Sequence, residues 1–302
     1  KAQYSFGWDW GPRLVQTGIW RPVYLEYIKQ AKLEDLYVEP KEISQDKAVV
    51  KLSGRVQDFG DGDYKLAVAA KREGRTEAQI ELDSGQFQPD KFQTELEITK
   101  PKLWYPRGVG DQPLYDFEFK LLQAGEVAAA KTKTTGLREV KLKQEADEIG
   151  ESFILEVNGK QVFAKGANWI PGESFLPQMT EEKYEQYIDW AVEANMNILR
   201  IWGGGIYEDD AFYEACDRKG IMVWQDFMYA CAEYPDQWES FREQARREAT
   251  QAVKRLRNHP SIVLWCGNNE VNWIFGQQQE QETVYGDRLF KQVLPEVCSE
   301  HD

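Results

Sequence analysis

The chain has 302 residues, of which 51 are acidic and 37 are basic, and its net charge is −14 at neutral pH. This acidic balance disfavours nucleic acid and anionic membrane surfaces as partners, and no apolar run approaches the roughly 20 residues that cross a bilayer. The length allows two or three domains with a substantial buried core.

The chain begins at Lys1 without an initiator Met or a signal-peptide pattern, in what reads as the middle of a strand-rich region. We therefore expect a piece of a longer protein. The sequence does not select between a periplasmic, secreted, lysosome-like or cytoplasmic compartment, and it does not fix an oligomeric state.

Residues 1–26 divide into a loop and a predicted strand. Residues 6–12 read Phe-Gly-Trp-Asp-Trp-Gly-Pro, a loop in which glycine and proline flank Trp8, Asp9 and Trp10. Residues 17–25 are predicted as a strand entered through a glycine turn. The loop has two interpretations. Composition alone favours a surface turn whose indoles pack on a core, and the alternative is a carboxylate held between aromatic walls to bind sugar hydroxyls.

Residues 27–141 form short alternating apolar and polar segments separated by turn signals. About seven strands over roughly 110 residues are typical of an immunoglobulin-like β-sandwich. No residue pattern in this region indicates chemistry. The predicted strands are residues 33–38, 47–56, 63–71, 79–82, 92–98, 114–122 and 131–139.

Residues 142–302 alternate strands with helices, which predicts a parallel sheet with right-handed crossovers. The predicted strands are residues 161–165, 197–202, 221–225 and 262–265. Four strands are half the number that closes a (β/α)₈ barrel. We therefore expect the first half of such a barrel.

The helices between these strands carry start and stop signals. Thr180 is placed to cap the first helix, the acids Glu208 to Asp210 begin the second, and Gly220 ends it. The third helix is predicted over residues 237–257, with a less distinct helical stretch near residues 283–298. The apolar face of the third helix is predicted to contain Trp238, Phe241, Ala245, Ala249, Ala252, Val253 and Leu256.

Neither a metal nor a cofactor is indicated. Four cysteines lack metal-ligand or redox spacing, and two histidines leave little room for a histidine cage. Residues 203–205 are three glycines after a strand, but a dinucleotide fingerprint requires a glycine where Glu208 stands. No Gly-x-Ser-x-Gly elbow of a serine hydrolase is present.

Carboxylate chemistry remains, centred on residues 265–270, Trp-Cys-Gly-Asn-Asn-Glu. Polar groups at the end of a buried strand are costly unless they meet a partner or a ligand, and active sites form at the carboxyl ends of parallel strands. We therefore expect Glu270 to be a catalytic carboxyl group. The other residues predicted to face this rim are Asn168, Trp169, Arg200, Trp202, Asp226, Asn268 and Asn269. Such a mixture of amide, indole and charged groups suits a neutral polyhydroxylated ligand.

Four segments together resemble the β-mannosidases of glycoside hydrolase family 2. They are residues 6–12, residues 166–171 (Gly-Ala-Asn-Trp-Ile-Pro), residues 199–205 (Leu-Arg-Ile-Trp-Gly-Gly-Gly) and residues 265–270. The Asn-Glu pair is shared by many related retaining glycosidases, whereas the Gly-Trp-Asp-Trp-Gly-Pro loop is far more specific to β-mannosidases.

The resemblance implies three domains: the end of a jelly-roll sugar-binding domain over residues 1–26, the sandwich over 27–141 and the barrel half over 142–302. It implies that Glu270 is the general acid/base, that Asn269 binds the sugar 2-hydroxyl and that Trp202 is a wall of the glycone subsite. The remaining implied roles are substrate contacts by Trp8, Asp9, Trp10, Asn168 and Trp169, with Arg200, Asn268 and Asp226 in a supporting layer.

The implied activity is exo-acting hydrolysis of terminal β-mannose from oligosaccharides or glycoconjugates, through a covalent glycosyl-enzyme. Two carboxyl groups about 5–5.5 Å apart serve such a mechanism. The nucleophile is expected to be a glutamate after a seventh strand, beyond this chain, so we expect this polypeptide alone to be inactive. The alternatives are an exo-β-glucosaminidase or β-galactosidase of the same family, or a non-catalytic carbohydrate-binding protein.

Overall fold

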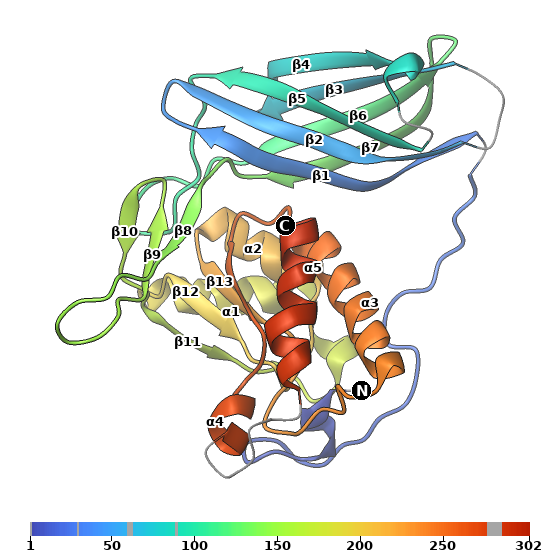
Figure 1. Ribbon diagram of the computed structural model, residues 1–302. Coiled ribbons are helices and arrows are strands. Elements are labelled where there is room, and N and C mark those ends of the chain that lie inside the picture. The colour runs from blue at the N-terminus through green and yellow to red at the C-terminus, as the bar shows by residue number, and fades with distance from the viewer. Residues whose placement is uncertain (1, 29, 59–62, 88–89, 277–285) are drawn as a thin grey trace. The chain divides into compact units, whose positions relative to one another are not determined.

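The computed structural model describes residues 2–28, 30–58, 63–87, 90–276 and 286–302 (Figure 1). The chain falls into two compact units. One contains Lys1–Pro22, Ala164–Arg257 and Ser261–Asp302, and the other contains Val23–Phe163 and Asn258–Pro260. Each unit is described by itself. Among the described residues, no helix is long and apolar enough to cross a membrane.

The second unit contains the predicted immunoglobulin-like sandwich, which is confirmed (Figure 1). Its two sheets are antiparallel and share one apolar core, because alternate side chains of each strand point inward. The first sheet has the order β1 (Ala31–Ile43), β2 (Lys47–Asp58), β5 (Lys91–Thr99). The second has the order β4 (Arg75–Asp83), β3 (Tyr64–Arg72), β6 (Tyr115–Gln123), β7 (Glu126–Thr135). A short 3₁₀ turn, η2 (Ser84–Gln86), follows β4.

Two strands of the sandwich begin earlier than predicted, because tight turns precede them. Glu73 and Gly74 have φ of 52° and 76°, and Ala124 and Gly125 have φ of 51° and 86°. Two successive left-handed residues are the signature of a two-residue hairpin. β4 and β7 therefore start directly after the strands with which they pair.

A small antiparallel sheet follows the sandwich, and it corrects one prediction. Its order is β10 (Lys160–Val162), β9 (Ile154–Val157), β8 (Val140–Lys143). Residues 161–165 are therefore not the first strand of the parallel sheet. Asn158 and Gly159, with φ of 49° and 75°, turn the chain back so that β10 pairs with β9.

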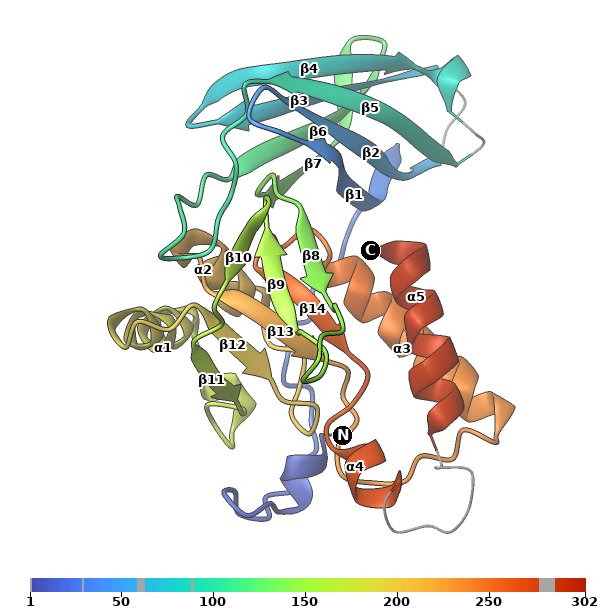
Figure 2. The ribbon, with the colours of Figure 1, turned by 60° about the vertical axis from the view of Figure 1, so that its left-hand side comes forward.

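The first unit contains a four-stranded parallel sheet, as predicted (Figure 2). Its order is β11 (Gly166–Trp169), β12 (Ile198–Ile201), β13 (Met222–Asp226), β14 (Ile262–Cys266). The connecting helices are α1 (Glu181–Glu193), α2 (Asp210–Lys219) and α3 (Glu239–Leu256). The arrangement is consistent with the start of a (β/α)₈ barrel. The register aligns Asn168 with Arg200, and Arg200 with Trp224.

The helix signals of the sequence correspond to actual caps. The Thr180 side chain accepts from the backbone N–H of Lys183, and the Asp209 side chain accepts from Ala211. Gly220 ends α2 in the left-handed conformation, with φ of 72°. Trp238 is an exception, because it precedes the first turn of α3 with extended backbone and is 62% exposed rather than part of the buried face.

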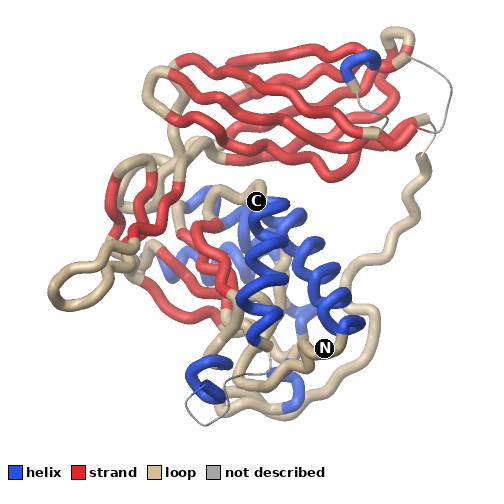
Figure 3. The backbone as a smooth tube through the Cα atoms, viewed as in Figure 1, coloured by secondary structure: helices blue, strands red, loops and turns tan. Residues whose placement is uncertain are grey.

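Residues 17–25 do not form the predicted strand, and Figure 3 shows them as loop. Ile19, Val23, Tyr24 and Leu25 are between 76% and 102% exposed. A strand requires a neighbouring strand for its hydrogen bonds, and none of the described strands pairs with this segment. The apolar alternation is present in the sequence, but its partner is not among the described residues.

The remaining elements of the first unit are short. They are the 3₁₀ turns η1 (Gln3–Phe6) and η3 (Leu176–Gln178), helix α4 (Val271–Gly276), the π-helical turn η4 (Leu289–Val293) and helix α5 (Leu294–His301). The helical stretch predicted near residues 283–298 corresponds to η4 and α5, and its residues 283–285 lie outside the described residues. α5 packs beside α3.

Candidate active site

A buried ion pair lies at the carboxyl end of β13. The Asp226 side chain is fully buried and accepts from Nε and Nη2 of Arg200, at 3.2 and 2.8 Å. It also accepts from Trp224 Nε1 and from the backbone N–H of Gly203, both at 3.0 Å. Burial raises the pKa of Asp226, and the charge and hydrogen bonds of Arg200 oppose this. Four donors compensate for the removal of the carboxylate from water.

Arg200 also holds two amide side chains. Its Nη2 donates to Asn269 Oδ1 at 2.9 Å, and its Nη1 donates to Asn168 Oδ1 at 3.3 Å. Asn168 lies on β11, Asp226 ends β13 and Asn269 follows β14. One guanidinium group on β12 therefore joins the ends of three other strands. The structure brings together these four residues, which the sequence assigned to one rim.

Glu270 follows Asn269 and has a left-handed backbone, with φ of 61°. Asn269 pairs with the segment after β13: its N–H donates to Tyr229 O at 2.8 Å, and its carbonyl accepts from the N–H of Cys231 at 3.0 Å. The Glu270 carboxylate is exposed at this edge, with Oε2 lying 3.4 Å from Asn269 Nδ2 and 3.3 Å from Cys231 Sγ. The backbone geometry thus projects a carboxylate into solvent at the end of the parallel sheet.

An aromatic cluster lies at the same end of the first unit. The Trp202 ring contacts Trp8 and Trp10 edge-on, with centroids 4.8 and 5.8 Å apart, and Tyr4 stacks on Trp10 at 5.7 Å. The backbone N–H of Tyr4 donates to Gly204 O at 3.2 Å. Residues 6–12 are therefore attached to the strand-end loop after β12. Such aromatic surfaces stack on the C–H faces of sugars.

Asp9 is exposed within this loop. On the same loop, Trp8 packs against the buried cluster of Tyr4, Trp202 and Ala230, and so does Cys231. The structure therefore gathers the Trp8–Asp9–Trp10 loop, Trp202 and the Asn269–Glu270 pair in one region.

The glycines after β12 are required by close packing. A Cβ atom at Gly203 would lie 2.6 and 2.7 Å from the carbonyl oxygens of Tyr229 and Phe227. A Cβ atom at Gly204 would lie 2.0 Å from the Trp202 ring. These glycines let the segment after β13 and the Trp202 ring approach the backbone, which explains a glycine run that is not a phosphate loop.

Trp169 is not part of this cluster. Its ring lies on the helix side of the sheet, 4.8 Å from Phe212 and 6.4 Å from Tyr184, and its Nε1 donates to Glu208 Oε1 at 2.9 Å. The hydroxyl of Tyr184 donates to Glu208 Oε2 at 2.6 Å. Glu208, predicted as an acid at the helix start, is 2% exposed. The structure therefore gives Trp169 a packing role in place of the predicted sugar contact.

Asn268 also serves a neighbouring element. Its Oδ1 accepts from the N–H of Val271 at 3.0 Å, and its Nδ2 donates to Asn272 Oδ1 at 3.3 Å. The amide thereby satisfies the start of α4, the helix that follows Glu270. Asn268 supports the position of Glu270 through the backbone.

The buried carboxyl of Glu208 gives a pH-dependent prediction. Burial raises its pKa above the ordinary 4.5, although the donors Tyr184 and Trp169 oppose this. A group with a raised folded-state pKa contributes stability that is complete below its unfolded value and is lost as the pH rises through the folded value. The stability that Glu208 contributes is therefore expected to fall above pH 4.5.

Glu208→Gln tests this expectation in the full-length protein that contains this chain. Glutamine cannot ionise and has a single acceptor oxygen, so the variant should be less stable by about 1–3 kcal/mol at low pH. The difference between the thermal unfolding midpoints of variant and wild type should narrow as the pH rises. A difference that stays constant or widens would contradict the raised pKa.

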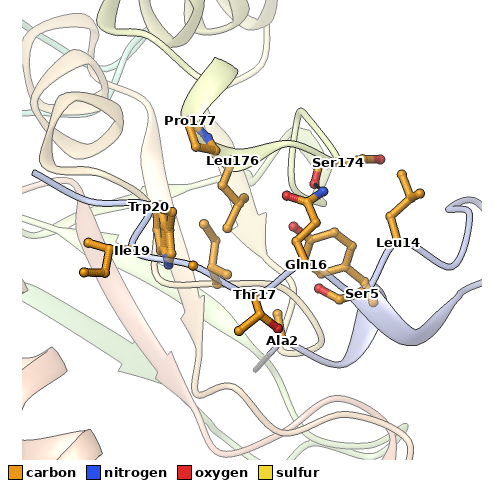
Figure 4. A pocket seen from close by; sticks show the side chains of 13 residues that line it. Ala2, Ser5, Leu14, Gln16, Thr17, Ile19, Trp20, Ser174, Leu176 and Pro177 are labelled. Atoms are coloured by element: carbon orange, nitrogen blue, oxygen red, sulfur yellow. Dashed lines mark hydrogen bonds between the residues drawn. The ribbon is translucent and has the colours of Figure 1, made fainter.

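A cavity of about 460 Å³ lies beside residues 14–20 (Figure 4). It is lined by Tyr4, Trp20, Leu176 and Ile206, among others, and none of its lining residues is acidic or basic. Gln16 Nε2 donates to Ser174 O at 3.2 Å beside it. The cavity contains no group for acid/base chemistry. Among the described residues, no group of three or more His, Cys, Asp or Glu side chains could hold a metal ion.

Comparison with known proteins relates two segments of the chain to one family. Residues 31–138 match the model described as glycosyl hydrolases family 2, and residues 1–21 match the glycosyl hydrolase 2 galactose-binding domain-like model. These two segments are similar to glycosyl hydrolase family 2. Nearly the whole chain is similar to β-mannosidases. It is 43% identical to beta-mannosidase B of Thermothelomyces thermophilus, over 99% of this chain and 36% of the relative.

Other relatives give the same result. Beta-mannosidase B of Emericella nidulans is 39% identical over 95% of this chain and 34% of its own length. The crystal structure of the β-D-mannosidase from Dictyoglomus thermophilum has a TM-score of 0.94 and 44% identity, covering all of this chain and 37% of that one. The β-glucuronidase of Parabacteroides merdae, at 17% identity and a TM-score of 0.74, shares the fold. The chain thus spans about a third of the length of these relatives.

Proposed function

We propose that this chain is the part of an exo-acting, retaining β-mannosidase that carries the general acid/base, Glu270. The observation that carries the proposal is the Arg200 network, which holds Asn269 and the adjoining Glu270 at the strand ends beside Trp202. The identity to β-mannosidases at about 40% over nearly the whole chain supports the sugar specificity. Because the chain spans about a third of those relatives, the nucleophile is assigned to a later strand of the barrel.

The proposed chemistry has two steps. In the first, Glu270 donates its proton to the glycosidic oxygen while the nucleophilic carboxylate attacks the anomeric carbon, and the leaving alcohol departs. In the second, Glu270 accepts a proton from water, which attacks the same carbon and releases the nucleophile. Retaining enzymes separate the two carboxyl groups by about 5–5.5 Å, so the acid must be held firmly while the partner is brought to it.

The resemblance to β-mannosidases implies roles for the surrounding residues, and their positions support these roles. Asn269, fixed through its Oδ1 by Arg200, has its Nδ2 near Glu270 and is assigned to the sugar 2-hydroxyl. Trp202 with Trp8 and Trp10 forms the wall on which the sugar stacks. Asp9 is assigned to the hydroxyls of the terminal sugar away from the cleaved bond. A loop that closes the far side of one sugar is what restricts cleavage to chain ends.

A panel of aryl β-glycosides tests the proposal with the full-length protein. The β-mannoside should have the highest kcat/KM, followed at a distance by the β-galactoside, β-glucosaminide and β-glucuronide. The product first released should have the β configuration by proton NMR, as a double displacement requires. Preference for another sugar would refute the mannosidase assignment. Binding of mannooligosaccharides without turnover would establish a carbohydrate-binding protein.

A further inference from the structure

The thiol of Cys231 lies against the proposed acid/base. Its Sγ is 3.3 Å from Glu270 Oε2 and 3.3 Å from Asn269 Nδ2, and these two atoms are 3.4 Å apart. The three groups form a small triangle in which the amide N–H donates to sulfur and the S–H donates to the carboxylate. Both contacts to Glu270 are made at Oε2.

The backbone fixes the position of this thiol. Cys231 has φ of 47°, a left-handed conformation that is uncommon for residues other than glycine. It is held there because its N–H donates to Asn269 O at 3.0 Å, while the N–H of Asn269 donates to Tyr229 O at 2.8 Å. The segment that carries the thiol is thus paired with the residue that precedes Glu270.

The opposite side of the same segment is also anchored. The Tyr234 hydroxyl accepts from the N–H of Ala230 at 2.7 Å, and Gln3 Nε2 donates to Ala230 O at 2.9 Å. Cys231 therefore follows a residue whose backbone is hydrogen-bonded from two directions. The backbone that carries Cys231 is therefore fixed where its thiol donates to Glu270 Oε2.

The thiol is a donor rather than a nucleophile. Burial raises the pKa of Cys231, and the hydrogen bond and charge of Glu270 raise it further, while Asn269 opposes the shift. The S–H form therefore predominates at neutral pH, and a protonated thiol is a poor nucleophile. Its chemical use is to donate to the carboxylate beside it.

We infer that Cys231 is a positioning residue of the proposed reaction, whose S–H holds Oε2 of Glu270 so that Oε1 carries the transferred proton. The inference rests on the proposed role of Glu270 as general acid/base. It assigns to Cys231 an effect on proton donation and none on recognition of the sugar. No motif in the sequence indicates this role, because the contact depends on the pairing of residues 229–231 with Asn269.

Two variants of the full-length enzyme test the inference, with Cys298→Ala as the control because Cys298 is a half-buried thiol on α5. Cys231→Ala should lower kcat/KM for phenyl β-mannoside by about three- to tenfold, the range expected for loss of one weak hydrogen bond. The kcat/KM for 2,4-dinitrophenyl β-mannoside should fall less, because its leaving group needs little proton donation. The alkaline limb of the pH profile should move to higher pH, since the ionised carboxylate has lost a donor.

In Cys231→Ser, both kcat/KM and the alkaline limb of the pH profile should return toward the wild-type values, because a hydroxyl also donates a hydrogen bond. An unchanged profile in Cys231→Ala would overturn the inference, and so would an equal loss on both substrates that serine does not restore. The thermal unfolding midpoint of each variant shows whether a folding defect contributes to the loss of activity. If Cys231→Ala does not fold, the pH profile of Cys231→Ser is compared with that of the wild type instead. If Glu270→Gln lowers kcat/KM equally for the two substrates in the same assay, the proposed function is wrong, and this inference is wrong with it.

Discussion

Glu270→Gln in the full-length enzyme is expected to lower the turnover of β-mannosides with poor leaving groups by about 10²–10⁴-fold, the range that general acid/base catalysis supplies. Glutamine keeps the shape of the side chain and the contacts with Cys231 and Asn269, but it has no transferable proton. Substrates whose leaving group is already acidic should be affected less in the first step. The measurement is kcat/KM over a series of aryl β-mannosides of decreasing leaving-group acidity.

A matched control is Glu193→Gln, an exposed glutamate at the end of α1, which should leave the whole series unchanged. A second variant, Glu270→Ala, makes room for a small anion such as azide. With an activated substrate, azide should accelerate turnover and form β-mannosyl azide, because it replaces water without needing a base. Equal losses on good and poor leaving groups, together with no azide product, would contradict the acid/base role.

Asp226→Asn is expected to destabilise the protein by about 3–5 kcal/mol, which is the usual cost of breaking a buried ion pair by removing one partner. The Asp226 side chain is fully buried, and it accepts from Arg200, Gly203 and Trp224. Asparagine turns one acceptor oxygen into a donor, so at least one of these donors must lose its partner. The thermal midpoint of the full-length protein should fall by several degrees, and the turnover should fall because Arg200 no longer holds Asn269 in one place.

The control for this prediction is Asp189→Asn, which breaks the contact between Asp189 and Lys219 at 2.6 Å. The Asp189 side chain is 55% exposed, and pairs of this kind contribute only about 0–1 kcal/mol. The two substitutions are chemically identical and differ in burial. Similar shifts of the thermal midpoint for both variants would show that the Arg200–Asp226 pair has no special role.

The sequence predicts the main features of the fold where local signals agree. The seven sandwich strands, the parallel order of the strands and the caps at Thr180, Asp209 and Gly220 all follow from alternation, helical spacing and capping chemistry. Residues 17–25 show the limit of such signals. Their alternation is that of a strand, but a strand forms only with a partner, and local sequence does not supply one.

The sequence predicts the candidate site best where the geometry of the parallel strands determines which side chains meet. Asn168, Arg200 and Asp226 converge because their strands are parallel and in register. Trp169 could have been excluded by the same geometry. Successive side chains of a strand point to opposite faces, so the neighbour of an inward Asn168 must face the helices. The burial of Glu208 on that side is then explained, because the donors of Trp169 and Tyr184 need an acceptor there.

The incorrect prediction of a parallel strand over residues 161–165 has a contrary signal in the sequence. Asn158 followed by Gly159 is a strong hairpin signal, and it explains why residues 160–162 pair backwards with β9 instead of starting the parallel sheet. Cys231 has no comparable signal. Its contact with Glu270 depends on two left-handed residues in loops 39 positions apart, and neither conformation can be read from residue type.

The Arg200 guanidinium serves three strand ends at once, and this constrains how the sequence can vary. Lysine at this position would keep the charge, but a single ammonium group lacks the planar fork that reaches Asp226, Asn269 and Asn168 together. A change at Arg200 removes the common donor of the other three side chains, and a change at any one of those three leaves a donor of Arg200 unmatched. Variation here is expected to be epistatic, with replacements arising as a set across all four strands or not at all.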